Sequence, residues 1–204
     1  MRGGVLLGGM IGIMLLAGCR APAPARYAAD FREGAPGWLL PRDPRFQARV
    51  EDGRLILTLQ PARTVAWALS PFAFREGQVE VEATLLEGPM SADYGLILEA
   101  GPGRLYRFAV SADGYYGIFV YERGAWRIRV DWTPHEAIRV GRTTNHLRVR
   151  REGGAMVFWI NGIEATRIPR DPGEEGGRVG VSIGTMAVGE AQVGFDRFLA
   201  SRAQ

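Results

Sequence analysis

The sequence predicts an all-β protein in which antiparallel strands pack as a two-sheet sandwich. Apolar and polar residues alternate with a period of two, most clearly in Gln78–Leu86, as in a strand with one buried face. Turn sequences such as Asp113–Gly114 and Asn161–Gly162 separate these segments and favour the positive φ angles of tight hairpins. Many short strands at regular spacing are typical of a sandwich or a barrel.

The same two signals predict strands from residue 27 almost to the C-terminus. In chain order the expected strands cover residues 27–31, 46–50, 54–60, 64–70, 78–86, 94–100, 104–111, 115–122, 125–131, 146–151, 155–161, 163–168, 178–184 and 190–199. Only Thr133–Ile138 has the pattern of a helical turn, with Thr133 as its cap and Pro134 in the first position.

The N-terminus has the plan of a secretory signal. Arg2 precedes an uncharged apolar run, Val5–Leu16, and small residues follow that run. A helix of about twelve residues spans roughly 18 Å, which is shorter than the roughly 30 Å hydrocarbon core of a membrane. We therefore expect residues 1–18 to be a cleaved signal peptide.

Leu16-Ala17-Gly18-Cys19 resembles the lipobox of bacterial lipoproteins. The resemblance implies that Cys19, the only cysteine of the chain, is acylated and becomes the new N-terminus. Arg20 stands where an inner-membrane retention signal would have Asp, so the implied location is extracytoplasmic, lipid-anchored to the cell membrane or the outer membrane. Residues 19–26 then form the lipidated cysteine and a Pro/Ala tether, which proline keeps extended.

Length and charge narrow the domain count and the classes of partner. The chain has 204 residues, and the part that follows the signal has the length of one domain. Such a length buries enough surface to hold a core without disulfides. The formal net charge is only +3, which argues against nucleic acid as the main partner. We expect a single sandwich domain over residues 27–204.

Five segments resemble the concanavalin A-like lectin and glucanase domains. They are Asp131–Pro134, Asn145–Val149, Val157–Gly162, Gly177–Val181 and Phe195–Phe198. Within that group the chain is most similar to laminin-G-like and 3-keto-disaccharide-hydrolase-type domains, over residues 27–200. The resemblance implies an antiparallel jelly-roll β-sandwich, but a shared fold does not carry chemistry with it.

The chain shows no catalytic motif that its context supports. The resemblance to glucanases implies a Glu-x-Asp-x-x-Glu strand, because retaining hydrolysis needs two carboxyls about 5 Å apart, and no such string is present. Glu80 and Glu82 share one face of a strand, and we interpret that face as the one exposed to solvent. Gly180–Gly184 matches the Gly-x-Ser-x-Gly pattern around Ser182, yet a serine hydrolase needs a strand–turn–helix and a later His. We therefore expect no catalytic residue.

The sequence offers one candidate cation site. His135–Glu136 lacks the second His of a zinc helix, and no Asp-rich calcium loop is present. The resemblance to laminin-G-like domains implies that scattered Asp and backbone oxygens could bind Ca²⁺. Asp30 and Asp196, on the first and last predicted strands, could share such a cation, or their carboxylates could cap hairpins instead.

Aromatic and arginine side chains are frequent between residues 94 and 132 and predict a ligand-binding surface. Alternation turns Arg107 away from the core, together with Phe119 and Tyr121. In residues 126–131 the alternation predicts that Trp126, Ile128 and Val130 face the core. The residues expected to face outward are Arg127, Arg129 and Asp131. The candidate carbohydrate-binding residues are Trp67, Tyr94, Glu99, Arg107, Phe119, Tyr121 and Arg129. Flat rings beside hydrogen-bonding groups suit a sugar, although the same rings could fill ordinary cross-strand pairs.

Three functions fit these observations. The first is a membrane-anchored, non-catalytic, lectin-like module that holds a glycan on one sheet. The second is a structural lipoprotein that docks another cell-envelope protein through the sandwich. The third is a sugar-processing hydrolase, which only the resemblance suggests. Exposed aromatics in a groove would favour the first, a flat apolar patch the second, and paired carboxylates in a pocket the third.

Overall fold

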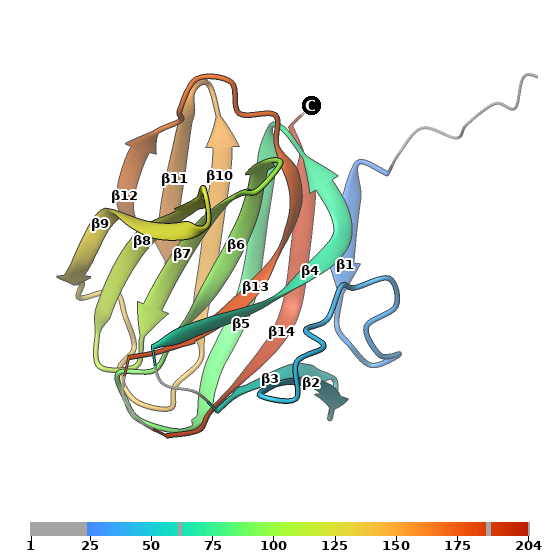
Figure 1. The fold of residues 1–204 in the computed structure, drawn as a ribbon, viewed down its shortest axis with the longest axis vertical. Helices are drawn as coiled ribbons and strands as arrows, with labels where there is room; N and C mark the ends of the chain where they lie inside the picture. Colours follow the sequence, from blue (N-terminus) through green and yellow to red (C-terminus); the bar gives the residue numbers. More distant parts are fainter. Residues whose placement is uncertain (1–23, 61–62, 187–188, 204) are drawn as a thin grey trace, which may run out of the picture.

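The protein is described from a computed structural model, which covers residues 24–60, 63–186 and 189–203 (Figure 1). These residues form strands, turns and loops, and no helix occurs among them. Accordingly, the part of the chain that the structure describes contains no helix able to cross a membrane. The predicted signal segment 1–18 and Cys19 lie outside the described residues.

The described residues form fourteen strands. They are β1 (Arg26–Ala29), β2 (Phe46–Glu51), β3 (Arg54–Leu59), β4 (Thr64–Phe74), β5 (Gly77–Glu87), β6 (Asp93–Gly101), β7 (Arg104–Ser111), β8 (Tyr115–Glu122), β9 (Ala125–Pro134), β10 (Asn145–Glu152), β11 (Ala155–Ile160), β12 (Ile163–Pro169), β13 (Gly177–Thr185) and β14 (Ala191–Arg202). Each predicted strand overlaps one of these, so the alternation and the turn signals are confirmed as predictors of strand order.

Two antiparallel sheets face each other as a sandwich (Figure 1). The eight-stranded sheet has the order β12-β11-β10-β5-β14-β3-β2, and β1 pairs with β14 beside this path. The six-stranded sheet has the order β4-β13-β6-β7-β8-β9. Neighbours such as β5 and β14 are far apart in sequence, so long-range pairing holds the fold together. The predicted all-β sandwich is confirmed.

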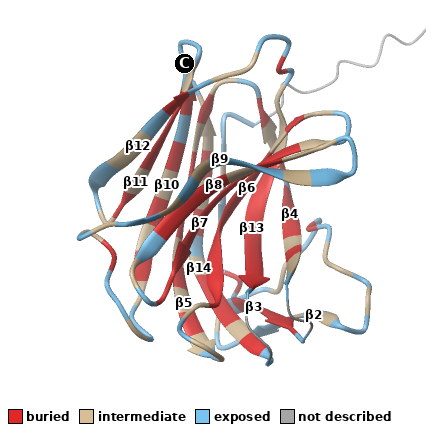
Figure 2. Ribbon diagram, turned by 60° about the vertical axis from the view of Figure 1, so that its left-hand side comes forward, coloured by how far each residue is buried: buried red, intermediate tan, exposed pale blue. Residues whose placement is uncertain are grey.

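The core lies between the sheets (Figure 2); strands such as β5 contribute alternate residues to it, whereas β6 is buried along almost its whole length. In β5 the inward residues Val79, Val81, Ala83 and Leu85 have no exposed surface, while the residues that alternate with these four are partly exposed. Phe108 on β7 and Phe158 on β11 meet across the core with ring centroids 5.7 Å apart. Burying one such aromatic or aliphatic side chain stabilises the fold by about 1.5–3 kcal/mol.

The predicted helical turn at Thr133–Ile138 is wrong. Strand β9 continues to Pro134, and the chain then makes a hydrogen-bonded turn in which the Ile138 N–H donates to the His135 carbonyl at 3.1 Å. Strand β9 is an edge strand, and an edge accepts proline because its missing N–H need not bond a neighbour. The Thr-Pro pair therefore ends a strand here instead of starting a helix.

The sandwich has two ends, which we call upper and lower as in Figure 1. The upper end holds the start of β1, the end of β14 and the β6–β7 turn, because Arg26 pairs with Ser201 and Gly101 with Arg104. The lower end holds the start of β6 at Asp93 and the end of β13 at Thr185, since Asp93 pairs with Gly184.

Candidate functional site

Small residues cross the middle of the six-stranded sheet on its outer face, the face away from the core. Ser182 pairs with Gly95, Gly95 with Ala109, and Ala109 with Gly117, so four neighbouring strands place small side chains in one row. Glycine within a strand lets another group approach the backbone closely. The row therefore leaves space on this face for larger side chains from the adjoining rows, and for a ligand.

A pocket of about 370 Å³ opens on the lower part of this face, and we call it the inner pocket. Its volume falls within the roughly 300–1,000 Å³ that ligand pockets occupy. Asp93 and Arg107 line it from the centre of the sheet, while Val65 of β4 and Met186 after β13 line one side. The other side is aromatic and comes from β8 and β9.

Asp93 and Arg107 form a buried ion pair in this pocket. Their side chains are only 3% exposed. Arg107 Nη2 donates to Asp93 Oδ1, and Arg107 Nε donates to Ser182 Oγ at 3.0 Å. Gly184 leaves room for the pair, since a Cβ there would lie 2.6 Å from Asp93 Oδ1. A buried charge without a partner is costly, so this pairing fixes both side chains in place.

Aromatic side chains of β8 and β9 form the other side of the inner pocket. The ring centroids of Phe119 and Trp132 are 5.2 Å apart at an angle of 55°. Gly117 permits this arrangement, because a Cβ there would lie 2.8 Å from Phe119 Cζ and 3.4 Å from Trp132 Cε3. Trp126 and Ile128 extend the same side, and Ile128 is 61% exposed. The pocket thus combines ring faces with a fixed polar pair.

Two irregularities in the pairing of β8 with β9 correct the predicted faces of residues 126–131. Ile128 pairs with Phe119 and faces outward, whereas Val130 pairs with Ile118 and faces the core. The residue between them, Arg129, is extra on its strand. A bulge of this kind re-aims side chains and is invisible to simple alternation. Trp126 and Ile128 therefore face the pocket side, not the core as predicted.

Most of the predicted binding residues lie on the outer face, but they do not form one site. Arg107 and Phe119 line the inner pocket. Trp67 and Tyr121 pack beside it against Trp126, with ring centroids 6.4 and 5.3 Å from that indole, in a small apolar cluster. Glu99 lies nearer the upper end, where its Oε2 accepts a hydrogen bond from the Arg178 N–H at 2.7 Å.

The prediction that Tyr94 and Arg129 belong to the binding surface is wrong. Tyr94 points into the core with no exposed surface, and its hydroxyl accepts a hydrogen bond from Asn145 Nδ2 at 3.0 Å. Arg129 reaches away from the pocket to Asp171, with Nη2 2.9 Å from Oδ1. Neither side chain can contact a ligand in the inner pocket. The predicted set omits three residues that line the inner pocket, Asp93, Trp132 and Met186. The available signal for them was the glycines at 95, 117 and 184, which let other groups approach the strands closely.

The remaining carboxylates and the serine motif have local partners. Glu80 and Glu82 lie on the outer face of the eight-stranded sheet, where they contact His146 at 3.2 Å and Arg197 at 2.8 Å. Ser182 lies within β13, in the middle of a continuous strand, and accepts the hydrogen bond from Arg107. A nucleophilic serine of the hydrolase type needs a sharp strand-to-helix turn, which this position lacks.

Asp30 and Asp196 each accept a hydrogen bond from a nearby backbone N–H. Asp30 Oδ1 accepts from Arg32 at 3.2 Å, and Asp196 Oδ1 accepts from Arg197 at 2.7 Å. Their strands do pair, since β1 lies against β14. Among the described residues no group of three or more His, Cys, Asp or Glu side chains could hold a metal ion. Calcium binding at these two residues stays a prediction.

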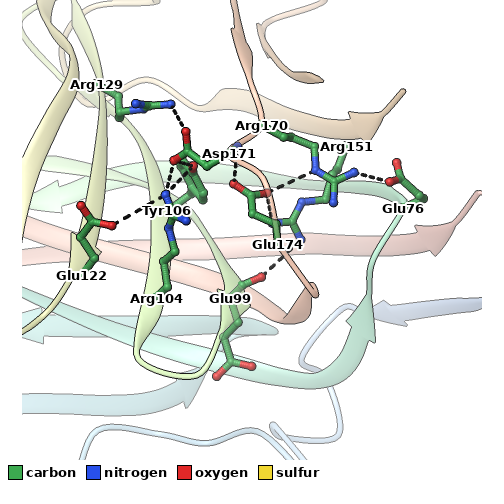
Figure 3. Close-up of polar contacts among 10 residues, drawn as sticks. All are labelled: Glu76, Glu99, Arg104, Tyr106, Glu122, Arg129, Arg151, Arg170, Asp171 and Glu174. Atoms are coloured by element: carbon green, nitrogen blue, oxygen red, sulfur yellow. Dashed lines mark hydrogen bonds and ion pairs between the residues drawn. The ribbon is translucent and has the colours of Figure 1, made fainter. Parts of the chain in front are cut away.

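A second polar cluster lies at the upper end of the sandwich (Figure 3). Asp171 accepts hydrogen bonds from Tyr106 Oη at 2.8 Å, from Arg129 Nη2 and from Arg104 Nη2. Glu174 contacts the side chain of Arg151 at 3.0 Å. Both carboxylates belong to the segment 170–176, which leads from β12 of one sheet to β13 of the other. We assign this cluster a structural role, because its carboxylates are occupied in holding that segment.

The cluster predicts a loss of stability in both acid and alkali. Burial alone would raise the pKa of Asp171, but the Tyr106 hydrogen bond and the Arg129 and Arg104 charges outweigh it and lower that pKa. Its contribution to stability is therefore complete above pH about 4 and is lost as the pH falls further. Burial, and next the hydrogen bonds to Glu174 and Asp171, raise the pKa of Tyr106 far above its usual value. The contribution of Tyr106 is therefore complete below pH about 10 and is lost above it.

Urea unfolding over a pH series, with tyrosinate absorbance, measures both losses. Asp171→Asn should reduce the stability lost in acid. Tyr106→Phe should reduce the stability lost in alkali, to which Tyr94 also contributes because burial raises its pKa. Ionisation of every tyrosine of the native protein near pH 10 would contradict the predicted upward shift of the Tyr106 pKa.

No family model and no curated protein matches this sequence. Among solved structures the fold is similar to that of the Crh5 transglycosylase in complex with NAG, with a TM-score of 0.68 at 13% identity over 89% of this chain and 86% of the other. It is similar to a Bacillus licheniformis β-glucanase, with a TM-score of 0.66 at 8% identity over 89% and 99%. It is also similar to the carbohydrate-binding module CBM66 from Bacillus subtilis, with a TM-score of 0.61 at 17% identity over 81% and 96%.

These likenesses show that the fold is an antiparallel jelly-roll sandwich of the concanavalin A-like type. The fold implied by the sequence resemblance is thereby confirmed. At such low identities the likeness establishes the fold alone, and function has to be argued from the site.

Proposed function

We propose that the protein is an extracytoplasmic lipoprotein that binds a glycan in its inner pocket without catalysis. The observation that carries this proposal is the pairing of aromatic rings, Phe119, Trp126 and Trp132, with the fixed polar pair of Asp93 and Arg107 in one pocket. A sugar ring offers an apolar face and a belt of hydroxyls. The rings can stack on the first, and the charged groups can exchange hydrogen bonds with the second.

The charges of the inner pocket favour binding over hydrolysis. Asp93 is held by Arg107, and the other carboxylate of the pocket, Asp131, accepts a hydrogen bond from its neighbour's N–H, that of Trp132, at 2.8 Å. Asp93 is on β6 and Asp131 on β9, three strands away. With strands about 4.8 Å apart, their backbones are separated by roughly 14 Å. Retaining hydrolysis needs carboxyl groups about 5 Å apart, a distance that two short Asp side chains cannot reach from backbones so far apart.

The structural likenesses agree with a glycan-related role. The similar structures include a transglycosylase in complex with NAG, a β-glucanase and a carbohydrate-binding module. They comprise enzymes and a binding module alike, so they support glycan recognition and are neutral on catalysis.

Loss of one pocket aromatic should weaken glycan binding. A glycan array of the full-length protein in detergent, with and without Ca²⁺, identifies the ligand. Trp126→Ala should then lower its affinity about tenfold, because an aromatic contact contributes up to about 1.5 kcal/mol. Trp159→Ala is the matched control, since Trp159 lies on the eight-stranded sheet and stacks on Arg148 instead. A clean negative array in both buffers, or equal effects of the two variants, would contradict the proposal.

A second candidate function is docking of another cell-envelope protein on the same face. Ile128 is 61% exposed and Met186 is 58% exposed, and both border the inner pocket. Exposed apolar side chains at a pocket rim also suit a protein partner. A negative glycan array together with specific capture of one envelope protein, lost in Ile128→Asp, would favour docking.

Anchoring is the other half of the proposal and has its own test. Cys19→Ser should abolish metabolic labelling with a fatty-acid probe, because the serine hydroxyl cannot replace the thiol that carries the lipid. The variant should accumulate as unprocessed or soluble protein, visible by fractionation. Unchanged labelling of the variant would refute the lipid anchor while leaving the glycan pocket untouched.

A further inference from the structure

A second cavity adjoins the inner pocket at the lower end of the six-stranded sheet, and we call it the outer pocket. It has a volume of about 210 Å³ and is lined by Ser91, Ser111, Asp113, Tyr115, Trp132 and Met186. Trp132 and Met186 line both pockets. The indole and the thioether therefore separate two adjoining spaces.

The size of the outer pocket indicates an extension of the inner one. Its volume of about 210 Å³ is below the roughly 300 Å³ at which ligand sites begin, whereas the inner pocket exceeds that value alone. A ligand seated between Val65 and Trp132 in the inner pocket has the outer pocket directly beyond the indole. An isolated small ligand would leave the outer space unused.

The chemistry of the outer pocket repeats that of the inner one. Two aromatic residues line it, Trp132 and Tyr115, and the Tyr115 residue is 41% exposed. The exposed Asp113 supplies a carboxylate on the same lining. Ring faces beside hydrogen-bond acceptors are the combination that a second sugar unit requires.

The turn that carries these groups is held in place by its neighbours. Ser111 Oγ donates to Asp113 Oδ1, and the Tyr115 N–H donates back to Ser111 Oγ at 3.3 Å. The segment 135–141 braces the turn from outside, because the Gly141 N–H donates to the Ala112 carbonyl at 2.7 Å and the His135 N–H to the Gly114 carbonyl at 3.1 Å. A preformed subsite binds with less loss of conformational entropy than a loop that must order.

We propose that the outer pocket is a second subsite of the glycan site, so that the protein recognises a chain of at least two sugar units across Trp132. This inference rests on the proposed glycan binding and deepens it. The first unit lies against Phe119 and the Asp93–Arg107 pair, and the next lies against Tyr115 and Asp113. Affinity then depends on chain length, which a single-sugar pocket would not show.

The test is calorimetric titration of the full-length protein in detergent with two probe series. These are glucose and N-acetylglucosamine, each with its β-linked disaccharide and trisaccharide. We expect the disaccharide of the bound series to bind about tenfold tighter than the monosaccharide, as one further aromatic contact allows. Tyr115→Ala should remove this gain and leave monosaccharide binding unchanged, while Tyr115→Phe, which keeps the ring, should retain most of it.

Each other outcome is decisive. Equal affinity for the monosaccharide and the disaccharide, or Tyr115→Ala without effect on either, overturns the second subsite and leaves the glycan pocket standing. A parallel loss for both ligands in Tyr115→Ala also overturns it, since the residue would then act on the inner pocket. Absence of binding by any probe, with near-ultraviolet circular dichroism showing a folded protein, overturns glycan recognition of these series and the subsite with it.

Discussion

Glu174→Gln is expected to lower the free energy of unfolding by about 3–5 kcal/mol, the usual effect of leaving one buried charge without its partner. Arg151 is fully buried, and its Nη2 lies 3.0 Å from Glu174 Oε2. The same oxygen contacts Arg170 Nε at 3.2 Å, and Oε1 accepts the Asp171 N–H at 3.1 Å. Glutamine keeps the shape but removes the charge that two arginines share.

Urea unfolding at neutral pH measures this effect, and the chain contains a matched control. Glu164 contacts Arg167 at 3.3 Å, but 43% of the Glu164 side chain is exposed. Glu164→Gln should therefore change the unfolding free energy by less than about 1 kcal/mol. Similar effects of the two variants would mean that the upper cluster in Figure 3 does not lock segment 170–176.

The second large effect is expected at the ion pair of the inner pocket. Asp93→Asn should cost about 3 kcal/mol or more of unfolding free energy, because it leaves the buried Arg107 guanidinium without its counter-charge. Replacing both residues, as in Asp93→Leu with Arg107→Met, should recover most of that loss, since apolar residues of similar volume often replace a buried pair at little cost.

A binding measurement on the double variant distinguishes a role of the ion pair in recognition from a purely structural role. The double variant should be stable yet should not bind the glycan, because it keeps the pocket shape and loses the polar pair. A double-mutant cycle on unfolding free energy gives the coupling between the two side chains. A stable double variant that binds with unchanged affinity would show that the ion pair supports the sheet and takes no part in recognition.

The fold was predictable because its signals are local. Period-two alternation in Gln78–Leu86 and glycine-containing turns such as Asn161–Gly162 identify strands and hairpins one at a time. The helical turn at Thr133–Ile138 failed for the opposite reason. Whether a Thr-Pro pair caps a helix or ends an edge strand depends on which strand lies beside it.

The candidate site was only partly predictable because its residues come from strands that are distant in sequence, and the register between those strands brings them together. Arg107 was expected on the outer face, but its partners Asp93 and Ser182 are set by the pairing of β6 with β7 and β13. Tyr94 was misplaced because β6 is apolar on both faces, with Leu96 inward and Ile97 outward and both fully buried. Alternation carries no directional signal in such a strand.

The bulged strand β9 is the third source of error. One extra residue turns the side chains that follow it to the other face until the next irregularity, so a face assignment made from Trp126 onward cannot hold through Val130. Sequence alone gives no mark of where such a residue enters. Glycines inside strands are the signal that was available, because Gly117 and Gly184 leave room for the Phe119 ring and the ion pair.

The entry of the chain at the upper end sets how far the pocket can reach. Pro24 lies against Arg202, whose Nη1 donates to the Pro24 carbonyl at 2.8 Å. Cys19 precedes Pro24 by five residues, so a fully extended tether spans at most about 18 Å. From there β6 leads down to Asp93 over eight residue steps, which add roughly 26 Å. With Cys19 lipidated as proposed, the tether and the length of the sheet together let Asp93 lie up to about 44 Å from the bilayer, so the pocket can sample polymers well beyond the lipid headgroups.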